Sequence, residues 1–164
     1  MSSELDRLIR TYARRGVALD SNVLLLYVAG THDEWLLDSF KRVSGFGREG
    51  FSRLQDLVAP FARLWTTPHV LTEVNGHANQ LPDWIKPEFN LTFRALIHEA
   101  FEIYTPATSL AEVDGFLHLG LTDASLVALA SEKDPLVVST DAPLVLHLMY
   151  SGSGALNFNH YLDW

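Results

Sequence analysis

Two aspartates occupy equivalent places in apolar segments that are far apart in the chain. Asp20 lies in "VALDSNVLLLYVAG" and Asp141 in "PLVVSTDAPLVLHLM", each at the end of a run typical of a buried strand. Two further acids, Glu73 in "PHVLTEVNGHA" and Asp123 in "LTDASLVALA", lie near the beginnings of predicted helices. Ionised carboxylates are rarely buried without a partner. Four of them gathered without basic partners would repel one another and raise one another's pKa values, a cost that a divalent cation removes.

These four acids are the ligand type for a hard divalent cation and for the chemistry that such a cation supports. Mg²⁺ and Mn²⁺ prefer oxygen ligands. A site of this kind suits displacement at phosphorus, because bound metal ions activate a water and stabilise charge on the leaving oxygen. Each acid taken alone also has a structural explanation. Asp20 and Asp141 are typical helix caps, Glu73 is typical of a solvated helix, and Asp123 lies in a first turn, where acids are favoured.

The spacing of apolar residues predicts the elements that must position the four acids. A short strand and then a helix beginning at Pro68 are expected within residues 64–78, and another helix begins in the first turn at Pro143. Residues 120–134 predict a helix with Thr122 as its N-cap. "GFGREG" (45–50) and "LPDWIKP" (81–87) are expected to be connections. Further helices are expected over 3–14, from 23, and over 35–40, 51–61 and 89–102, and further strands over 17–20, 103–107, 135–140 and 155–161.

Strands that alternate with helices predict an α/β protein, a three-layer α/β/α fold with a mostly parallel central sheet. In such sheets, ligands bind outside the carboxyl ends of the strands. Asp20 and Asp141 follow such ends, so the strands would direct them into a site rather than into the core. The 164 residues predict a single domain, with a leading helix in residues 1–15 and a core in residues 17–158.

Composition limits the class of protein and its partners. Apolar residues form 48% of the chain, charged residues 20%, and there is no cysteine to act as a thiolate ligand or nucleophile. "MSSELDRLIRTYARRG" lacks the apolar centre of a secretory signal, which predicts a cytoplasmic protein without a membrane partner. The net charge of −8 argues against a broad basic face. Residues 1–63 hold nine basic and eight acidic residues, whereas residues 64–164 hold three and twelve, and bound cations would offset part of that excess.

Four segments of the chain, taken in order, resemble the successive acidic motifs of PIN domains. They are "VALDSNVLLLY", "PHVLTEVNGHA", "LTDASLVALA" and "LVVSTDAPLV", and the resemblance extends from Val17 to about Phe158. PIN domains are metal-dependent nucleases, and many are RNA-cleaving toxins of toxin–antitoxin pairs. The resemblance therefore implies a metal-dependent endoribonuclease with Mg²⁺ or Mn²⁺ as cofactor and RNA as substrate. An antitoxin protein and a second copy of the chain are the candidate protein partners.

The same resemblance assigns roles to individual residues. It implies that the catalytic and metal-binding residues are Asp20, Glu73, Asp123 and Asp141. Asn22, two residues after the first aspartate, and Ser139, two residues before the last, match polar positions of the motifs. We expect both to orient the acids by hydrogen bonds. His77 follows Glu73 by four residues and shares its helix face, but we favour a structural or solvent-exposed role for it over ligation.

Two other functions remain open at this stage. One is a PIN-like module that binds RNA or protein without catalysis, although such a module has no need to keep four acids. The other is an α/β phosphatase, which the "DSN" triplet beginning at Asp20 disfavours because the second aspartate of that motif is missing. Substituting asparagine for Asp20 or Asp141 should abolish cleavage. The same change relieves repulsion, so stability without metal should be unchanged or raised.

Overall fold

Short buried strands form the centre of the fold, which the computed structural model describes for residues 3–163. β1 and β4 are buried along their whole length, as is typical of parallel strands with helices on both faces. The sheet order is β3-β2-β1-β4-β5, and every neighbouring pair is parallel. The strands are β1 (Val17–Leu19), β2 (Leu64–Thr66), β3 (Phe101–Glu102), β4 (Leu136–Ser139) and β5 (Ala155–Asn157).

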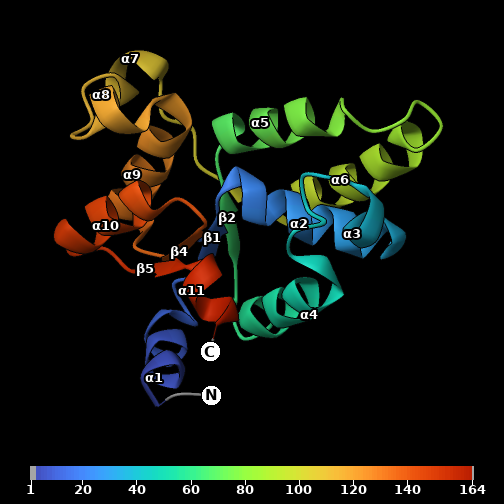
Figure 1. The fold of residues 1–164 in the computed structure, drawn as a ribbon. Coiled ribbons are helices and arrows are strands. Elements are labelled where there is room, and N and C mark those ends of the chain that lie inside the picture. Colours follow the sequence, from blue (N-terminus) through green and yellow to red (C-terminus); the bar gives the residue numbers. More distant parts are fainter. Residues whose placement is uncertain (1–2, 164) are drawn as a thin grey trace.

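Helices cover both faces of this sheet, so the predicted three-layer α/β/α architecture is confirmed (Figure 1). The helices that connect β1 to β2 and β2 to β3 lie on one side, and α9 and α10 lie on the other. The helices are α1 (Ser3–Tyr12), α2 (Ser21–His32), α3 (Trp35–Ser39), α4 (Gly47–Val58), α5 (Pro68–Ala78), α6 (Lys86–Glu99), α7 (Ala107–Leu110), α8 (Phe116–Leu119), α9 (Leu121–Lys133), α10 (Ala142–Tyr150) and α11 (Phe158–Leu162). Within residues 3–163, no helix combines the length and the apolar character needed to cross a bilayer.

The order of the strands changes direction at the centre of the sheet. The chain runs outward from β1 to β2 and β3, then returns past β1 to form β4 and β5. The direction of winding therefore reverses between β1 and β4, whose ends are aligned by the pairing of Leu19 with Val138. In open α/β sheets, ligands bind outside the carboxyl ends of the strands at such a reversal. Asp20 and Asp141 follow β1 and β4, so the topology alone brings the two residues to this point.

The central position of helix α2 in the fold explains why its sequence is apolar on every side. It packs against α3, α4, α5 and α6 as well as the sheet. Residues Val23 to Leu26 are almost inaccessible to solvent, and an all-round apolar helix is typical of such a position. Gly30 lies directly against the ring of Phe51 on α4, where a Cβ atom would overlap the ring. Since α2 begins at Asp20, the core packing of this helix fixes the position of the first acid.

The structure corrects two predicted strands at the edges of the sheet. The strand expected over 103–107 is wrong, because β3 occupies Phe101–Glu102 and α6 ends at Glu99 rather than continuing to residue 102. That helix also begins earlier than expected, with a proline in its first turn, where the missing N–H costs nothing. The strand expected over 155–161 ends at Asn157. The side chain of Asn157 accepts hydrogen bonds from the N–H groups of Asn159 and His160 and so begins α11.

Two helix starts also differ from the prediction. Thr122 is not the N-cap of α9, since the helix begins one residue before it and Gly120 is the capping residue, with φ of 84°. A positive φ of this kind favours glycine, and apolar spacing alone does not indicate where it occurs. The segment "GFGREG" is only partly a connection, because Gly47 already starts α4. The predicted domain also includes residues 1, 2 and 164, which lie outside the described residues.

Candidate active site

Asp20 is the most deeply buried of the four acids, Asp20, Glu73, Asp123 and Asp141. Only 5% of its surface is exposed. One carboxylate oxygen, Oδ1, accepts a hydrogen bond of 2.7 Å from the N–H of Val23, so Asp20 caps α2. The other, Oδ2, accepts from the N–H of Thr140 at 2.8 Å and from the hydroxyl of Ser139. Burial raises the pKa of Asp20, and these hydrogen bonds oppose that rise because they favour the ionised form.

Ser139 connects the first acid to the last. Its hydroxyl donates to Oδ2 of Asp20 and accepts a 2.9 Å hydrogen bond from the N–H of Asp141. Ser139 is completely buried, so both contacts are shielded from water. Asn22 lies further from the acids, and its side-chain amide is 3.5 Å from the hydroxyl of Thr140. Ser139 therefore contacts an acid directly, whereas Asn22 reaches Asp20 only through Thr140.

Asp141 has a more accessible carboxylate than Asp20. It caps α10, with Oδ1 accepting a 3.0 Å hydrogen bond from the N–H of Leu144, and the residue is exposed. Pro143 lies in the first turn of that helix, as predicted. The cap is a full structural explanation for one oxygen of Asp141. Its other oxygen has no hydrogen-bond partner within residues 3–163, which leaves it available to a ligand.

Asp123 carries the clearest electrostatic sign that the four acids are near one another. Its pKa is raised from 3.8 to about 7, first by burial and then by the negative charges of Asp141, Asp20 and Glu73, in that order. It lies in the first turn of α9, where the helix dipole favours a negative charge. The burial and the three neighbouring charges outweigh that benefit. Near neutral pH, this carboxyl group is therefore poised between its protonated and ionised forms.

Glu73 approaches the other acids from α5 and has one basic neighbour. Its Oε1 lies 3.7 Å from Nε2 of His77, one helical turn later. Burial and the charge of Arg42 lower the pKa of His77, while Glu73 acts in the opposite direction. The two residues do share a helix face, as their spacing predicted. His77 contacts Glu73 in this arrangement and makes no contact with the three aspartates among the interactions described.

A hydrogen bond that the sequence did not predict joins the two helices that carry Glu73 and Asp123. Thr67 caps α5 and its hydroxyl lies 2.8 Å from that of Ser125 on α9. Both residues are buried, and Ser125 also donates to the carbonyl of Thr122. Thr140 is a second contact residue that has no signal of its own in the sequence, although it lies between Ser139 and Asp141 in the last motif. Contacts between residues so distant in sequence leave no periodic pattern to find.

The chemistry of the four acids fits a hard cation, but their positions do not form a finished coordination site. Carboxylate oxygens are the ligands that Mg²⁺ and Mn²⁺ prefer. Within residues 3–163, no three Asp, Glu, His or Cys side chains are close enough together to hold one metal ion. Electrostatic repulsion acts over longer distances than metal coordination. The raised pKa of Asp123 is therefore consistent with the absence of a ready-made coordination site among the described residues. At least one of these side chains must move before three of them could share an ion.

The hydrogen bonds of Asp20 change the expectation for its substitution by asparagine. In either orientation an amide would place its NH₂ group against a backbone N–H donor, that of Val23 at the Oδ1 position or that of Thr140 at the Oδ2 position. We therefore expect Asp20→Asn to destabilise the fold, instead of leaving it unchanged. The side chain of Asp141 makes only a capping hydrogen bond, and asparagine is a good N-cap residue. Asp141→Asn and Asp123→Asn are consequently the more informative substitutions.

Comparison with known proteins adds no assignment to this geometry. A scan of the chain against models of protein families finds no match, and a search among curated proteins finds none either.

Proposed function

We propose that this chain is a PIN-like, metal-dependent endoribonuclease whose active site is formed by Asp20, Glu73, Asp123 and Asp141. The observation that carries the proposal is the raised pKa of Asp123, to which burial contributes most and to which the charges of three carboxylates from separate elements of the fold add. Like charges destabilise a fold unless a ligand compensates for them. Asp20 and Asp141 lie where the direction of winding reverses between β1 and β4, and this position supports a ligand-binding role as well.

Within the proposed mechanism, the residues around the acids have distinct tasks. Ser139 and Thr140 hold Oδ2 of Asp20, so that this carboxylate has a fixed orientation. The Thr67–Ser125 contact holds α5 against α9 and thereby limits the separation of Glu73 from Asp123. When bound by the four acids, Mg²⁺ or Mn²⁺ would supply an activated water and stabilise charge on the leaving oxygen of the RNA.

Asp123 gives the proposed site its own dependence on pH. A carboxyl group must lose its proton before it can bind a cation, so cation affinity rises as the carboxyl group ionises. With a pKa of about 7, Asp123 is largely protonated at pH 6 and largely ionised at pH 8. We therefore expect cleavage at limiting Mn²⁺ to increase from pH 6 to pH 8, with less increase at saturating Mn²⁺.

A cleavage assay on unstructured single-stranded RNA tests the proposal. The unmodified protein should cleave in Mg²⁺ or Mn²⁺ and not in EDTA. Asp141→Asn and Asp123→Asn should remove cleavage while the variants remain folded. Asp56→Asn is the matched control, because Asp56 is an exposed acid on α4 outside the site, and its activity should be unchanged.

The alternative function is a PIN-like module that binds RNA or protein without cleaving it. RNA binding in EDTA without cleavage in any divalent cation would favour that alternative. If both Asp141→Asn and Asp123→Asn still cleaved RNA, the proposed catalytic role of these acids would be wrong. If the enzyme proposal holds, toxin activity in the cytoplasm, with a protein antitoxin as partner, becomes a further proposal to test by induced expression.

A further inference from the structure

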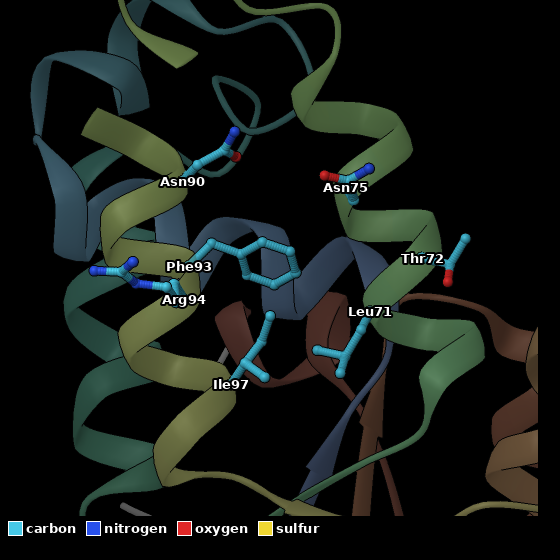
Figure 2. A pocket seen from close by; sticks show the side chains of 7 residues that line it. All are labelled: Leu71, Thr72, Asn75, Asn90, Phe93, Arg94 and Ile97. Carbon is cyan, nitrogen blue, oxygen red and sulfur yellow. The ribbon is translucent and has the colours of Figure 1, made fainter. Parts of the chain in front are cut away.

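A hollow of about 360 Å³ lies between α5 and α6, on the side of α5 away from α9 (Figure 2). This volume lies at the lower end of the roughly 300–1,000 Å³ that small-molecule sites occupy, and the hollow is widely open to solvent. The apolar lining consists of Leu71, Phe93 and Ile97, of which Leu71 and Phe93 are buried. Figure 2 shows these three side chains extending between the two helices, so the hollow has an apolar interior with one aromatic ring.

Two amides without internal partners stand at one end of the hollow. Figure 2 shows the side chains of Asn75 on α5 and Asn90 on α6 extending toward each other above Phe93. Neither side chain has a hydrogen bond or ion pair with any part of residues 3–163. Each amide has an acceptor oxygen and two N–H donors. The pair therefore offers hydrogen-bonding groups on two sides of the same space.

The charge around the hollow differs from that of the surrounding region. Residues 64–164 contain only three basic residues, Lys86, Arg94 and Lys133. Lys86 and Lys133 are paired with Asp83 and Glu132, whereas Arg94 has no acidic partner within the described part of the chain. Arg94 lines the hollow with its stem, and its guanidinium extends along the outer side of α6. No acidic residue lines the hollow.

The hollow and Glu73 lie on different faces of α5, and one exposed face of the helix lies between them. Successive helical residues are about 100° apart, so Leu71, Thr72 and Glu73 lead around α5 from the hollow to the acids. Thr72 is also among the residues that line the hollow, and Figure 2 shows its side chain extending from the side of α5 opposite α6. Gly76 lies one turn beyond Thr72 on the same exposed side, and a Cβ atom there would meet nothing within 4 Å. The backbone of α5 is therefore uncovered at Gly76, and a strand that crosses the helix there meets no Cβ atom.

We propose that the hollow binds one unpaired base of a single-stranded RNA, whose sugar–phosphate chain crosses α5 over Gly76 to the four acids. This inference rests on the proposed nuclease function and adds a specificity site to it. A nucleobase is a flat group with apolar faces and a polar edge. One of its faces packs against the apolar lining, where Ile97 is the most exposed side chain, and its edge exchanges hydrogen bonds with Asn75 and Asn90. Face and edge contacts of this kind are how proteins commonly recognise unpaired RNA bases.

Nucleotide binding can be measured without any cleavage. In EDTA, each of the four nucleoside 5′-monophosphates is titrated into ¹⁵N-labelled protein, with ribose 5-phosphate as the control ligand that lacks a base. The side-chain amide signals of Asn75 and Asn90 should shift with at least one nucleotide and not with ribose 5-phosphate. Asn75→Ala and Asn90→Ala should each raise the dissociation constant about threefold to tenfold, the cost of a lost hydrogen bond. Asn79→Ala, an exposed neighbour that does not line the hollow, should change nothing.

Cleavage kinetics then test the path over α5. Gly76→Trp should raise KM for an oligonucleotide about tenfold and leave kcat and mononucleotide binding unchanged, because it obstructs the strand and not the hollow. Unshifted amide signals, or equal shifts with ribose 5-phosphate, would overturn the base-binding site even if the protein cleaves RNA. An unchanged KM in Gly76→Trp would overturn the path. Amide shifts in a protein that never cleaves would keep the hollow as a nucleotide site and reject the nuclease function.

Discussion

Substituting asparagine for Asp123 should stabilise the protein at alkaline pH and leave its stability unchanged in acid. Asp123 has a pKa of about 7 in the folded protein, compared with about 3.8 as its ordinary value. The folded state therefore binds this proton more tightly than the unfolded chain does. The resulting stabilisation is complete below about pH 4 and is lost as the pH rises toward 7. Asparagine stays neutral throughout and escapes that loss.

The size of the effect follows from the shift in pKa. Each pKa unit corresponds to about 1.4 kcal/mol, so the full difference would be about 4 kcal/mol. Asp123 is only partly buried, and solvent screening should reduce the expressed value to about 1–2 kcal/mol. We therefore expect Asp123→Asn to have a free energy of unfolding about 1–2 kcal/mol higher than the unmodified protein at pH 8, without divalent cations.

Urea unfolding at pH 4 and pH 8, both in EDTA, measures this difference directly. Asp56→Asn on α4 provides the control, since the exposed Asp56 should give no pH-dependent change. A variant that is less stable than the unmodified protein at pH 8 would refute the reasoning. It would mean that Asp123 makes a stabilising contact, and that crowding of the four acids does not dominate its energetics.

Three other predictions concern packing, hydrogen bonding and cation binding. Ser139→Ala should lower the free energy of unfolding by about 1–3 kcal/mol, because Asp20 loses a buried hydrogen-bond donor. Urea unfolding measures this loss, with the exposed Ser52→Ala as the control. Gly30→Ala should lower the melting temperature because the new Cβ atom overlaps the ring of Phe51, whereas Gly76→Ala should raise it. Millimolar Mn²⁺ should raise the melting temperature of the unmodified protein, and no shift would count against a metal site.

Much of the architecture could be predicted from apolar periodicity, because long-range packing and local pattern agree there. The helix after Asp20 and the buried strand before Asp141 are examples, and both lie close to their predicted places. The edge strands were harder to predict. β3 has only two residues, both exposed, so no burial pattern marks it. The left-handed backbone of Gly120 also has no periodic signature, which is why the start of α9 was misplaced.

The candidate site shows the same division between local and distant information. Asp20 and Asp141 could be placed together because parallel strands end at the same edge, a rule that needs only the order of the elements. The contacts that hold the site, Thr67 with Ser125 and Thr140 with Asp20, join residues that are 58 and 120 positions apart. Side-chain pairing over such distances depends on the exact packing of helices on the sheet. It is therefore visible only in three dimensions.

Anomalous X-ray scattering from crystals soaked in Mn²⁺ tests the central claim most directly, since it locates the cation without assuming any activity. We predict a peak within bonding distance of carboxylate oxygens from at least two of the four acids, with Asp123 or Glu73 moved inward from its present position. The peak should disappear in crystals of Asp141→Asn. If well-ordered crystals in millimolar Mn²⁺ gave no peak between β1 and β4, with all four carboxylates unmoved, the metal-dependent nuclease proposed here would be contradicted.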